Sequence, residues 1–246
     1  MNFFKSFTAR NAYTRHNQGN RAFEMGKKEE GLAFHKQALE LYEKAFKDGM
    51  DDPNYVMAYS ILLMRYDHLE KSRDVMLRLN NAQMTSDQRK QLHSNYAVLQ
   101  WKMGNLDKAI EQMRIVDGSG RTAFVYTVLG QFLIEKAKET GDFAEAIRFN
   151  EEAYEYDEED PSTLDNLGQL KLAMGERDAA IDYFQRALAE KPSQIVTCYT
   201  LAQLYFEDGK KAEALELLDR TAKGNFSTLC PVTREQIEDL KAKIRG

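Results

Sequence analysis

The stretch PSTLDNLGQLKLAMGERDAAIDYFQRALAEKP, residues 161–192, is the one from which the rest of the chain is interpreted. Counted from Pro161, it has Gly168 at offset 8 and Ala180 at offset 20. A small residue is needed at both offsets, because two helices of one unit press together there. Phe184 and Ala187, at offsets 24 and 27, continue this stripe along the second helix. The stretch therefore predicts a close-packed pair of helices.

The same two small positions recur in five other stretches of the chain. They are Gly19 and Ala38, Ser60 and Ser72, Ala97 and Ala109, Gly130 and Ala146, and Ala202 and Ala214. The recurrence predicts repeated units at about residues 12–52, 53–86, 90–122, 123–160, 161–194 and 195–228. The first unit has about seven extra residues and the fourth about four, which predicts helices longer by about two turns and one turn, respectively.

Helix starts are marked by recognisable sequence signals. Asp52 and Asp160 each precede a proline, which suits an N-cap followed by the first helical residue. Thr85 and Thr233 each stand three residues before a glutamine, the spacing of a capping box. The segment 232–245 is amphipathic and is predicted to be a helix that caps the end of the array. Residues 1–11 are interpreted as a partly ordered tail.

Across residues 12–228 these patterns resemble the tetratricopeptide-repeat family. Leu164 and Lys171 stand where the family has tryptophan and tyrosine, and Asn150 replaces the large apolar residue of its second helix. The resemblance implies an all-α, right-handed superhelical solenoid of about six helix pairs plus a capping helix, in one domain over residues 1–246. Members of this family mostly bind proteins or peptides on the concave face, which comes largely from the first helix of each pair.

Composition narrows the classes of function. The net charge is −5, made up of +4 in residues 1–122 and −9 in residues 123–246, which argues against a general nucleic-acid binder. Cys198 and Cys230 are too few for a disulfide framework, so a reducing, cytoplasmic location is expected. No stretch has the length and apolarity of a membrane span, and the first ten residues do not have the features of a secretory signal.

The family's groove positions, carried over residue by residue, give the candidate partner-binding residues. They are Tyr13, His16, Asn20, Met57, Ile61, Met64, Arg65, Asn95, Val98, Trp101, Lys102, Gln131, Asn166, Gln169, Tyr199 and Gln203. Some members grip a C-terminal carboxylate with cations at offsets 2, 5, 6 and 9, but no lysine or arginine occupies those offsets in this chain. The pattern therefore predicts that chaperone tails are not bound through that clamp.

Two apolar readings of the groove remain open. Met57, Ile61, Met64, Val98 and Trp101 could form an apolar strip beside Arg65 and Lys102 that takes an anchor side chain of the partner. Alternatively, Met64 and Trp101 pack between neighbouring units, because methionine and aromatic stripes usually belong to a core.

Candidate chemical sites have weak sequence support. The acidic run 151–160 is interpreted as a solvated helix face, and the four histidines do not have the spacing of zinc ligands. Cys198 is expected to be buried and inert, and the Gly-Ser-Gly at 118–120 is expected to be a turn, since it lacks the residues of a phosphate loop. No enzyme activity, cofactor or metal is predicted.

The sequence thus predicts a non-catalytic scaffold that binds a protein or peptide of unknown identity in its groove. Two alternatives stay open: an assembly module that self-associates, and a regulatory or sensor domain of a larger enzyme or membrane-associated system. Direct insertion into a membrane is not expected.

Overall fold

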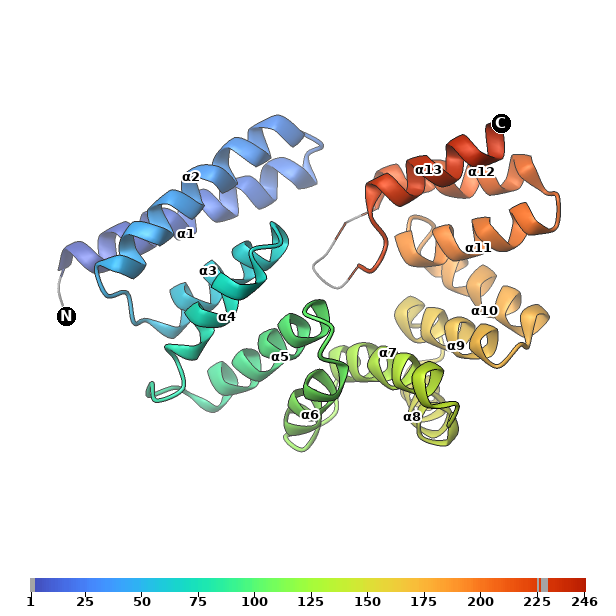
Figure 1. Ribbon diagram of the computed structural model, residues 1–246, viewed down its shortest axis with the longest axis horizontal. Coiled ribbons are helices and arrows are strands. Elements are labelled where there is room, and N and C mark those ends of the chain that lie inside the picture. The colour runs from blue at the N-terminus through green and yellow to red at the C-terminus, as the bar shows by residue number, and fades with distance from the viewer. Residues whose placement is uncertain (1–2, 225, 227–229) are drawn as a thin grey trace. The chain divides into compact units, whose positions relative to one another are not determined.

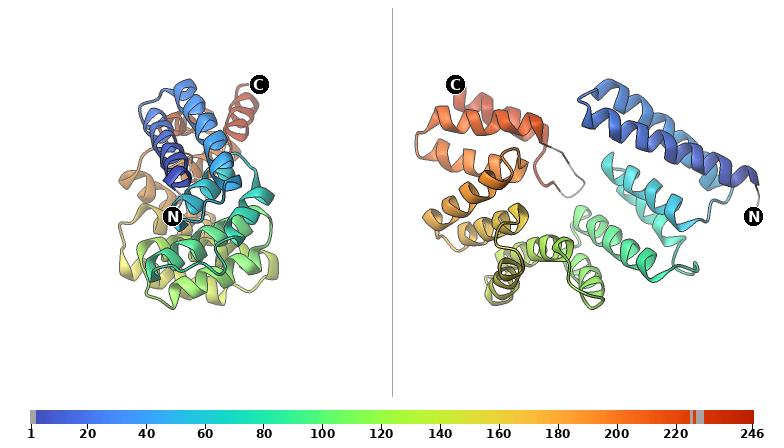
Figure 2. Two further views of the ribbon diagram at one scale, coloured as in Figure 1. Left: turned by 90° about the vertical axis from the view of Figure 1, so that its left-hand side faces the viewer. Right: turned by 180° about the vertical axis from the view of Figure 1, so that it is seen from behind.

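The regular elements are all helices in the part of the chain that the structure describes, residues 3–224, 226 and 230–246 of a computed structural model (Figure 1). The chain divides into two compact units, Met1–Val116 (unit 1) and Asp117–Gly246 (unit 2). Helices pack as antiparallel pairs within each unit (Figure 2). The all-α, helix-pair fold expected from the sequence is confirmed.

Each compact unit contains a series of helices with short connections between them. Unit 1 contains α1 (Phe3–Glu24), α2 (Lys28–Lys47), α3 (Pro53–Arg65), α4 (Leu69–Leu77), α5 (Ser86–Lys102) and α6 (Leu106–Asp117, whose last residue is assigned to unit 2). Unit 2 contains α7 (Ala123–Thr140), α8 (Ala144–Tyr156), α9 (Pro161–Ala173), α10 (Arg177–Glu190), α11 (Ile195–Glu207), α12 (Lys211–Arg220), a 3-10 turn (Thr221–Lys223) and α13 (Arg234–Arg245). The pairs are α1 with α2, α3 with α4, α7 with α8, α9 with α10, and α11 with α12. The prediction of one continuous domain stays a prediction. Residues 1–2 of the expected tail, and residues 227–228 at the end of the last predicted unit, lie outside the described residues.

The helix starts use the caps that the sequence indicates. The Asp52 carboxylate accepts a hydrogen bond from the Asn54 amide at 2.9 Å, and the Asp160 carboxylate accepts one from the Thr163 amide at 2.7 Å. The Thr85 and Thr233 capping boxes are both complete. Because these bonds satisfy amides that have no partner inside the helix, they fix where α3, α5, α9 and α13 begin.

The small residues lie where the two helices of a pair cross. A Cβ atom on Gly168 would lie 2.4 Å from the Phe184 ring, so only glycine lets α9 approach α10 this closely. Ser72 on α4 donates to the backbone oxygen of Ser60 on α3 at 2.9 Å, and both side chains are completely buried. A larger residue at these crossings would have to separate the helices.

Asn150 on α8 occupies the place that Phe184 holds on α10. It is completely buried and donates to the carbonyl oxygens of Ala146 at 2.8 Å and Gly130 at 3.4 Å. Its own carbonyl oxygen, Oδ1, is buried without a hydrogen-bond partner. A buried acceptor without a partner costs about 1–3 kcal/mol.

Replacing Asn150 with leucine is therefore expected to stabilise unit 2 by about 1 kcal/mol, because the unpaired oxygen is removed and the position becomes apolar as in the other pairs. Hydrogen exchange of the α7 and α8 amides in the full chain measures the change. A loss of protection would mean instead that the amide stabilises the packing of these two helices.

The first pair is longer than the others, as predicted. Helix α1 has 22 residues and α2 has 20, whereas α3 has 13 and α4 has 9. Helix α1 also begins at Phe3, nine residues before the predicted unit, so most of the expected tail is helical. No glycine or proline interrupts residues 3–18, and Ala9 and Ala12 are buried in the core of unit 1 beside Met50 and Val56.

Helix α13 packs on α12 at the end of unit 2, where a capping helix was expected. Ile237, Leu240 and Ile244 are buried and join the core cluster that contains Leu217 and Leu218. Lys241 forms an ion pair with Asp219 on α12 at 2.9 Å. The apolar face of α13 thus covers α12, and its charged face remains in solvent.

Candidate functional site

The predicted partner-binding residues lie on the first helix of each pair. We call the surface that these first helices form within a unit the first-helix face. In unit 1 this face is made by α1, α3 and α5, and in unit 2 by α7, α9 and α11. The predicted residues that keep some solvent exposure are Tyr13, Asn20, Ile61, Arg65, Asn95, Trp101 and Lys102 in unit 1, and Gln131, Gln169, Tyr199 and Gln203 in unit 2. The buried ones are His16, Met57, Met64, Val98 and Asn166.

The predicted apolar strip requires correction, because three of its five members are buried. Met57 and Met64 are each 1% exposed and Val98 is 6% exposed, so they pack in the protein interior. For Met64 the structure therefore favours the packing alternative. Ile61 and Trp101 are half-buried and are the two members with surface to offer. A buried methionine could reach a partner only if the packing around it opened.

In unit 1 a cluster of polar side chains supports the first-helix face. Asn20 Oδ1 accepts a hydrogen bond from the Arg65 guanidinium at 2.5 Å and lies 3.1 Å from Nε2 of His35. His35 Nδ1 lies 2.9 Å from the Tyr66 hydroxyl. We call Asn20, His35, Arg65 and Tyr66 the His35 cluster. It joins α1, α2 and the end of α3, and holds the exposed Arg65 in one place.

His35 was not among the predicted residues, because it lies on the second helix of its pair. It is completely buried. A Cβ atom on Gly19 would lie 2.1 Å from the imidazole carbon Cδ2, so the glycine of α1 makes room for this ring. The sequence indicates this site only through Gly19, a glycine at the position where the two helices cross, in a unit whose second helix contains His35.

Burial keeps two histidines of unit 1 neutral. Desolvation, with the Arg65 charge as a smaller contribution, lowers the pKa of His16 to about 3 and that of His35 to about 4. The two rings are edge-on, with centroids 5.4 Å apart. Nδ1 of His16 is buried without a hydrogen-bond partner. A proton on either ring would place a buried positive charge beside Arg65.

In unit 2 the first-helix face carries one glutamine at offset 9 of each successive helix. These are Gln131 on α7, Gln169 on α9 and Gln203 on α11, which we call the glutamine row; all three side chains are partly exposed. Gln131 donates to Glu135 at 3.1 Å, and Gln169 donates to Thr200 of α11 at 3.1 Å. Amide side chains can both donate and accept, as a peptide backbone requires of its partner.

Buried polar contacts tie the three helices of this face together. Asn166 of α9 donates to the Thr127 carbonyl of α7 at 3.0 Å. Thr197 of α11 donates to the Asp165 carboxylate of α9 at 2.7 Å. Because the contacts cross from one pair to the next, they fix the relative positions of the glutamines. The predicted binding residue Asn166 therefore positions the face from beneath.

Asp165 is a titratable group within this support. Burial raises its pKa to about 6, and hydrogen bonds from Thr197 and Gln169 offset part of that rise. A carboxyl whose pKa is higher in the folded state than in the unfolded state makes unit 2 less stable as the pH rises through about 4 to 6.

The substitution Asp165→Asn is expected to stabilise unit 2 by about 1–3 kcal/mol at pH 7, because the uncompensated charge is removed while the acceptor for Thr197 remains. The gain should shrink at pH 5, where the native carboxyl is protonated. Urea denaturation of the full chain at both pH values measures it. The matched variant Asp239→Asn, at an exposed site of α13, should change stability by less than about 0.5 kcal/mol. Equal effects of the two substitutions would contradict the assignment.

Chemical groups elsewhere do not assemble into a site. Within the described ranges, no cluster of three or more histidine, cysteine or acidic side chains could hold a metal ion. Cys198 and Cys230 are free thiols, and burial raises the pKa of Cys198 to about 11, so its thiolate is scarce at pH 7. In the acidic run, Glu152 is paired with Arg121. A search of the described helices for one that is long and apolar enough to cross a bilayer finds none.

Family models described as tetratricopeptide repeat match the sequence at residues 11–52 and 171–227. The chain contains tetratricopeptide repeats in these two stretches. The first match coincides with the predicted first unit, and the second covers most of the last two units. It begins at the end of α9, includes the whole of α10, α11 and α12, and ends before α13.

Solved tetratricopeptide-repeat structures share the fold of this chain. One from Parabacteroides merdae is 14% identical with a TM-score of 0.58, and the alignment covers 96% of this chain and 100% of that one. The C-terminal part of a repeat protein from Cytophaga hutchinsonii is 17% identical, with a TM-score of 0.57 and coverage of 86% and 77%. The pilF protein of Pseudomonas aeruginosa is 19% identical, with a TM-score of 0.54 and coverage of 78% and 88%. These likenesses establish the repeat fold.

Curated relatives match part of the chain. The photosystem I assembly protein Ycf3 of Prochlorococcus marinus (strain MIT 9303) is 29% identical over 123 residues, which is 46% of this chain and 69% of that protein. The protein CTR9 homolog of Arabidopsis thaliana is 30% identical over 114 residues, again 46% of this chain but 10% of that protein. The chain thus spans a tenth of the CTR9 homolog's length and about two thirds of this Ycf3 protein's.

Proposed function

We propose that this chain is a non-catalytic scaffold that binds an extended segment of a partner protein along the first-helix face of unit 2. Tetratricopeptide-repeat folds form protein-interaction scaffolds, and the glutamine row is the observation that carries the finer assignment. Gln131, Gln169 and Gln203 repeat one polar group at the same position of neighbouring helices. A periodic row of this kind suits a periodic ligand, and the backbone of an extended peptide is periodic.

The spacing of packed helices supports an extended ligand. Neighbouring helix axes lie about 8–10 Å apart, and an extended chain rises by about 3.3 Å per residue. Successive glutamines would therefore contact the peptide at positions about three residues apart. Main-chain hydrogen bonds would supply affinity, and the side chains between the glutamines would supply selectivity.

Unit 1 would add a second contact surface of different chemistry. Tyr13, Ile61 and Trp101 offer apolar surface, and Arg65 is an exposed cation held by Asn20. Lys102 is partly neutralised by Asp67, at 3.5 Å. This surface suits an apolar or acidic side chain of the same partner. The positions taken from the family's carboxylate clamp lack lysine and arginine, so a chaperone tail is not the proposed ligand.

The Ycf3 relatives suggest a biological setting for such a scaffold. Their name assigns them to the assembly of photosystem I. We extend to this chain the general role of holding a protein during assembly. The partner is not specified by the match. The two unbridged thiols suit the reducing cytoplasm that we propose as its location.

Affinity capture from the source cell with matched variants tests this function. The test variant carries Gln131→Ala, Gln169→Ala and Gln203→Ala. The control carries Gln18→Ala, Gln37→Ala and Gln83→Ala, which are exposed glutamines of unit 1 outside the glutamine row. Losing three hydrogen bonds of about 1 kcal/mol each should reduce partner recovery at least tenfold in the test variant and leave it unchanged in the control. Equal recovery with both variants would refute the assignment to the glutamine row.

A further inference from the structure

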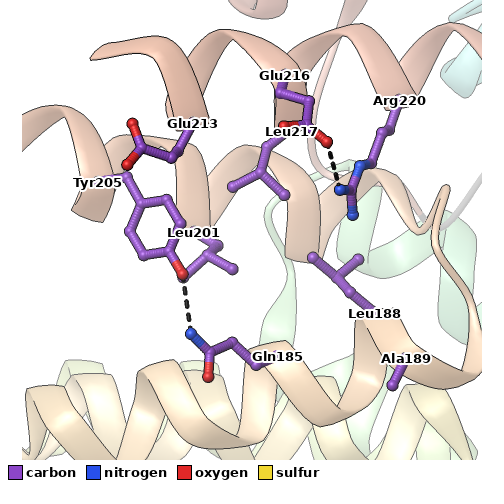
Figure 3. A pocket seen from close by; sticks show the side chains of 9 residues that line it. All are labelled: Gln185, Leu188, Ala189, Leu201, Tyr205, Glu213, Glu216, Leu217 and Arg220. Atoms are coloured by element: carbon purple, nitrogen blue, oxygen red, sulfur yellow. Dashed lines mark hydrogen bonds and ion pairs between the residues drawn. The ribbon is translucent and has the colours of Figure 1, made fainter. Parts of the chain in front are cut away.

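Unit 2 has a cavity between α10, α11 and α12 (Figure 3). Its volume is about 350 Å³. Leu188 of α10, Leu201 of α11 and Leu217 of α12 lie beneath it and are buried, so the apolar surface open to a ligand comes from the exposed Ala189 and the half-buried Tyr205. A cavity of this size fits one or two side chains rather than a large cofactor.

A second hollow continues from this cavity along α10. It is lined by Glu158, Glu159, Leu164, Arg186, Ala189 and Glu190, and Ala189 lines both hollows. We call the two together the α10 groove. It therefore has an apolar part between α10 and α12 and a polar part near the loop before α9.

Acidic side chains without a counter-ion surround the α10 groove. Glu158, Glu159, Glu190 and Glu213 are exposed, and no ion pair to any of them occurs among the described residues. Figure 3 shows Glu213 next to Tyr205 among the side chains that line the cavity.

Three cations at or beside the groove already have partners. Lys210 lies over the Tyr205 ring, 5.1 Å from its centroid, and pairs with Asp208 at 4.0 Å. Arg220 is paired with Glu216 at 2.7 Å. Arg186 donates to the Tyr154 hydroxyl at 2.8 Å and lies over the Tyr154 and Tyr183 rings. Unit 2 as a whole has 25 aspartate and glutamate residues against 16 lysine and arginine residues. The groove therefore lies in a negative field that attracts positive ligands and repels nucleic acid and acidic peptides.

From this charge and shape we infer that the α10 groove binds a basic segment of a protein in which lysine or arginine alternates with apolar residues. An apolar side chain of the ligand would lie against Ala189 and Tyr205, above the buried leucines Leu188, Leu201 and Leu217. A lysine ammonium of the ligand would pair with Glu213, next to the Tyr205 ring over which Lys210 already lies. A second cation farther along the segment would meet Glu158, Glu159 or Glu190. The lining of this site includes residues of α9 and α11 but none of Gln131, Gln169 and Gln203, so it leaves the glutamine row free for another ligand.

Nuclear magnetic resonance on the full chain, with labelled leucine methyl groups, tests the inference. The probe is the synthetic peptide GKLKGKLKG, and GELEGELEG is its acidic counterpart. The expected result is that the lysine peptide shifts the methyl signals of Leu188, Leu201 and Leu217, that added salt weakens the effect, and that the glutamate peptide has no effect.

Three variants separate a built groove from general attraction to negative charge. Ala189→Trp fills the exposed position shared by both hollows and should abolish the shifts. The pair Glu190→Gln and Glu213→Gln should weaken binding at least fivefold. The pair Glu29→Gln and Glu40→Gln removes the same charge from exposed sites of unit 1 and should change binding less than twofold. Circular dichroism confirms that each variant is folded.

Several outcomes would overturn the inference. They are the absence of shifts at millimolar lysine peptide, equal binding of the glutamate peptide, equal weakening by the two charge-removing pairs, and shifts that persist in folded Ala189→Trp. Sedimentation of the unliganded chain tests one more outcome. If the chain dimerises as its concentration rises, and the leucine methyl signals change over the same concentration range, the occupant of the α10 groove is a second copy of the chain and not a basic partner. None of these results bears on the glutamine row, which the capture experiment tests separately.

Discussion

Replacing Phe184 with alanine is expected to destabilise unit 2 by about 3–5 kcal/mol, the usual cost of removing a fully buried phenylalanine. Phe184 is completely buried, and its ring fills the space that Gly168 leaves on the facing helix. Neither α9 nor α10 can close the resulting cavity without losing its other contacts, because both are held by neighbouring pairs. Hydrogen exchange of the α9 and α10 amides in the full chain measures the loss.

The control for this prediction is Phe124→Ala in the same unit. Phe124 is 44% exposed at the start of α7, so its removal should cost less than about 1 kcal/mol. If the two substitutions had equal effects on the hydrogen-exchange protection of α9 and α10, the packing of these two helices would not depend on the Phe184 ring. The repeat register built on residues 161–192 would then be wrong.

Lowering the pH from 7 to 5 is expected to destabilise unit 1 by about 3–4 kcal/mol, because His16 and His35 are buried as neutral rings. Their pKa values are about 3 and about 4 in the folded chain, against an ordinary value of 6.5. Below about pH 6.5 the two imidazoles are therefore protonated in the unfolded chain but stay neutral in the folded chain. Stability is fully present above that pH and is lost progressively as the pH falls toward 4.

Hydrogen exchange of the α1 and α2 amides at pH 7 and pH 5, corrected for the intrinsic exchange rate, measures this loss. The substitution His35→Gln should remove about half of the pH dependence, whatever its effect on stability at pH 7. The matched change His68→Gln, at an exposed position before α4, should leave the pH dependence as it is. An unchanged dependence in His35→Gln would show that other groups titrate. The pKa of Asp165 is raised on folding and not lowered, so the same change from pH 7 to pH 5 should increase the free energy of unfolding of unit 2 by about 1 kcal/mol.

The fold was predictable from features that act over short range. A small residue at a helix crossing excludes nearly every alternative spacing, and both capping boxes are defined by the residues of a single turn. Gly168 opposite Phe184 and the Thr233 cap are examples that could be identified from the sequence alone. The longer first and fourth pairs followed from counting residues between such markers.

The site was less predictable, because exposure depends on how helices rotate against their neighbours. Met57 and Met64 were placed on the groove by their offsets, but packing within the repeat array turns both inward. The His35 cluster combines residues from three helices, and only Gly19 indicated it in the sequence. The α10 groove depends on the mutual position of α10, α11 and α12, which a linear pattern does not specify. The acidic run was interpreted as a solvated face, and the groove now gives two of its residues, Glu158 and Glu159, a proposed role.

Photo-cross-linking in the source cell is the most direct test of the proposal that the first-helix face of unit 2 holds a partner protein. A photoreactive benzoylphenylalanine is placed at Gln131, at Gln203 and, as a control, at Glu111, an exposed residue of α6 in unit 1. The account predicts that the two glutamine positions form a covalent adduct with the same protein and that Glu111 does not. Adducts that form from Glu111, with none from Gln131 or Gln203, would contradict it.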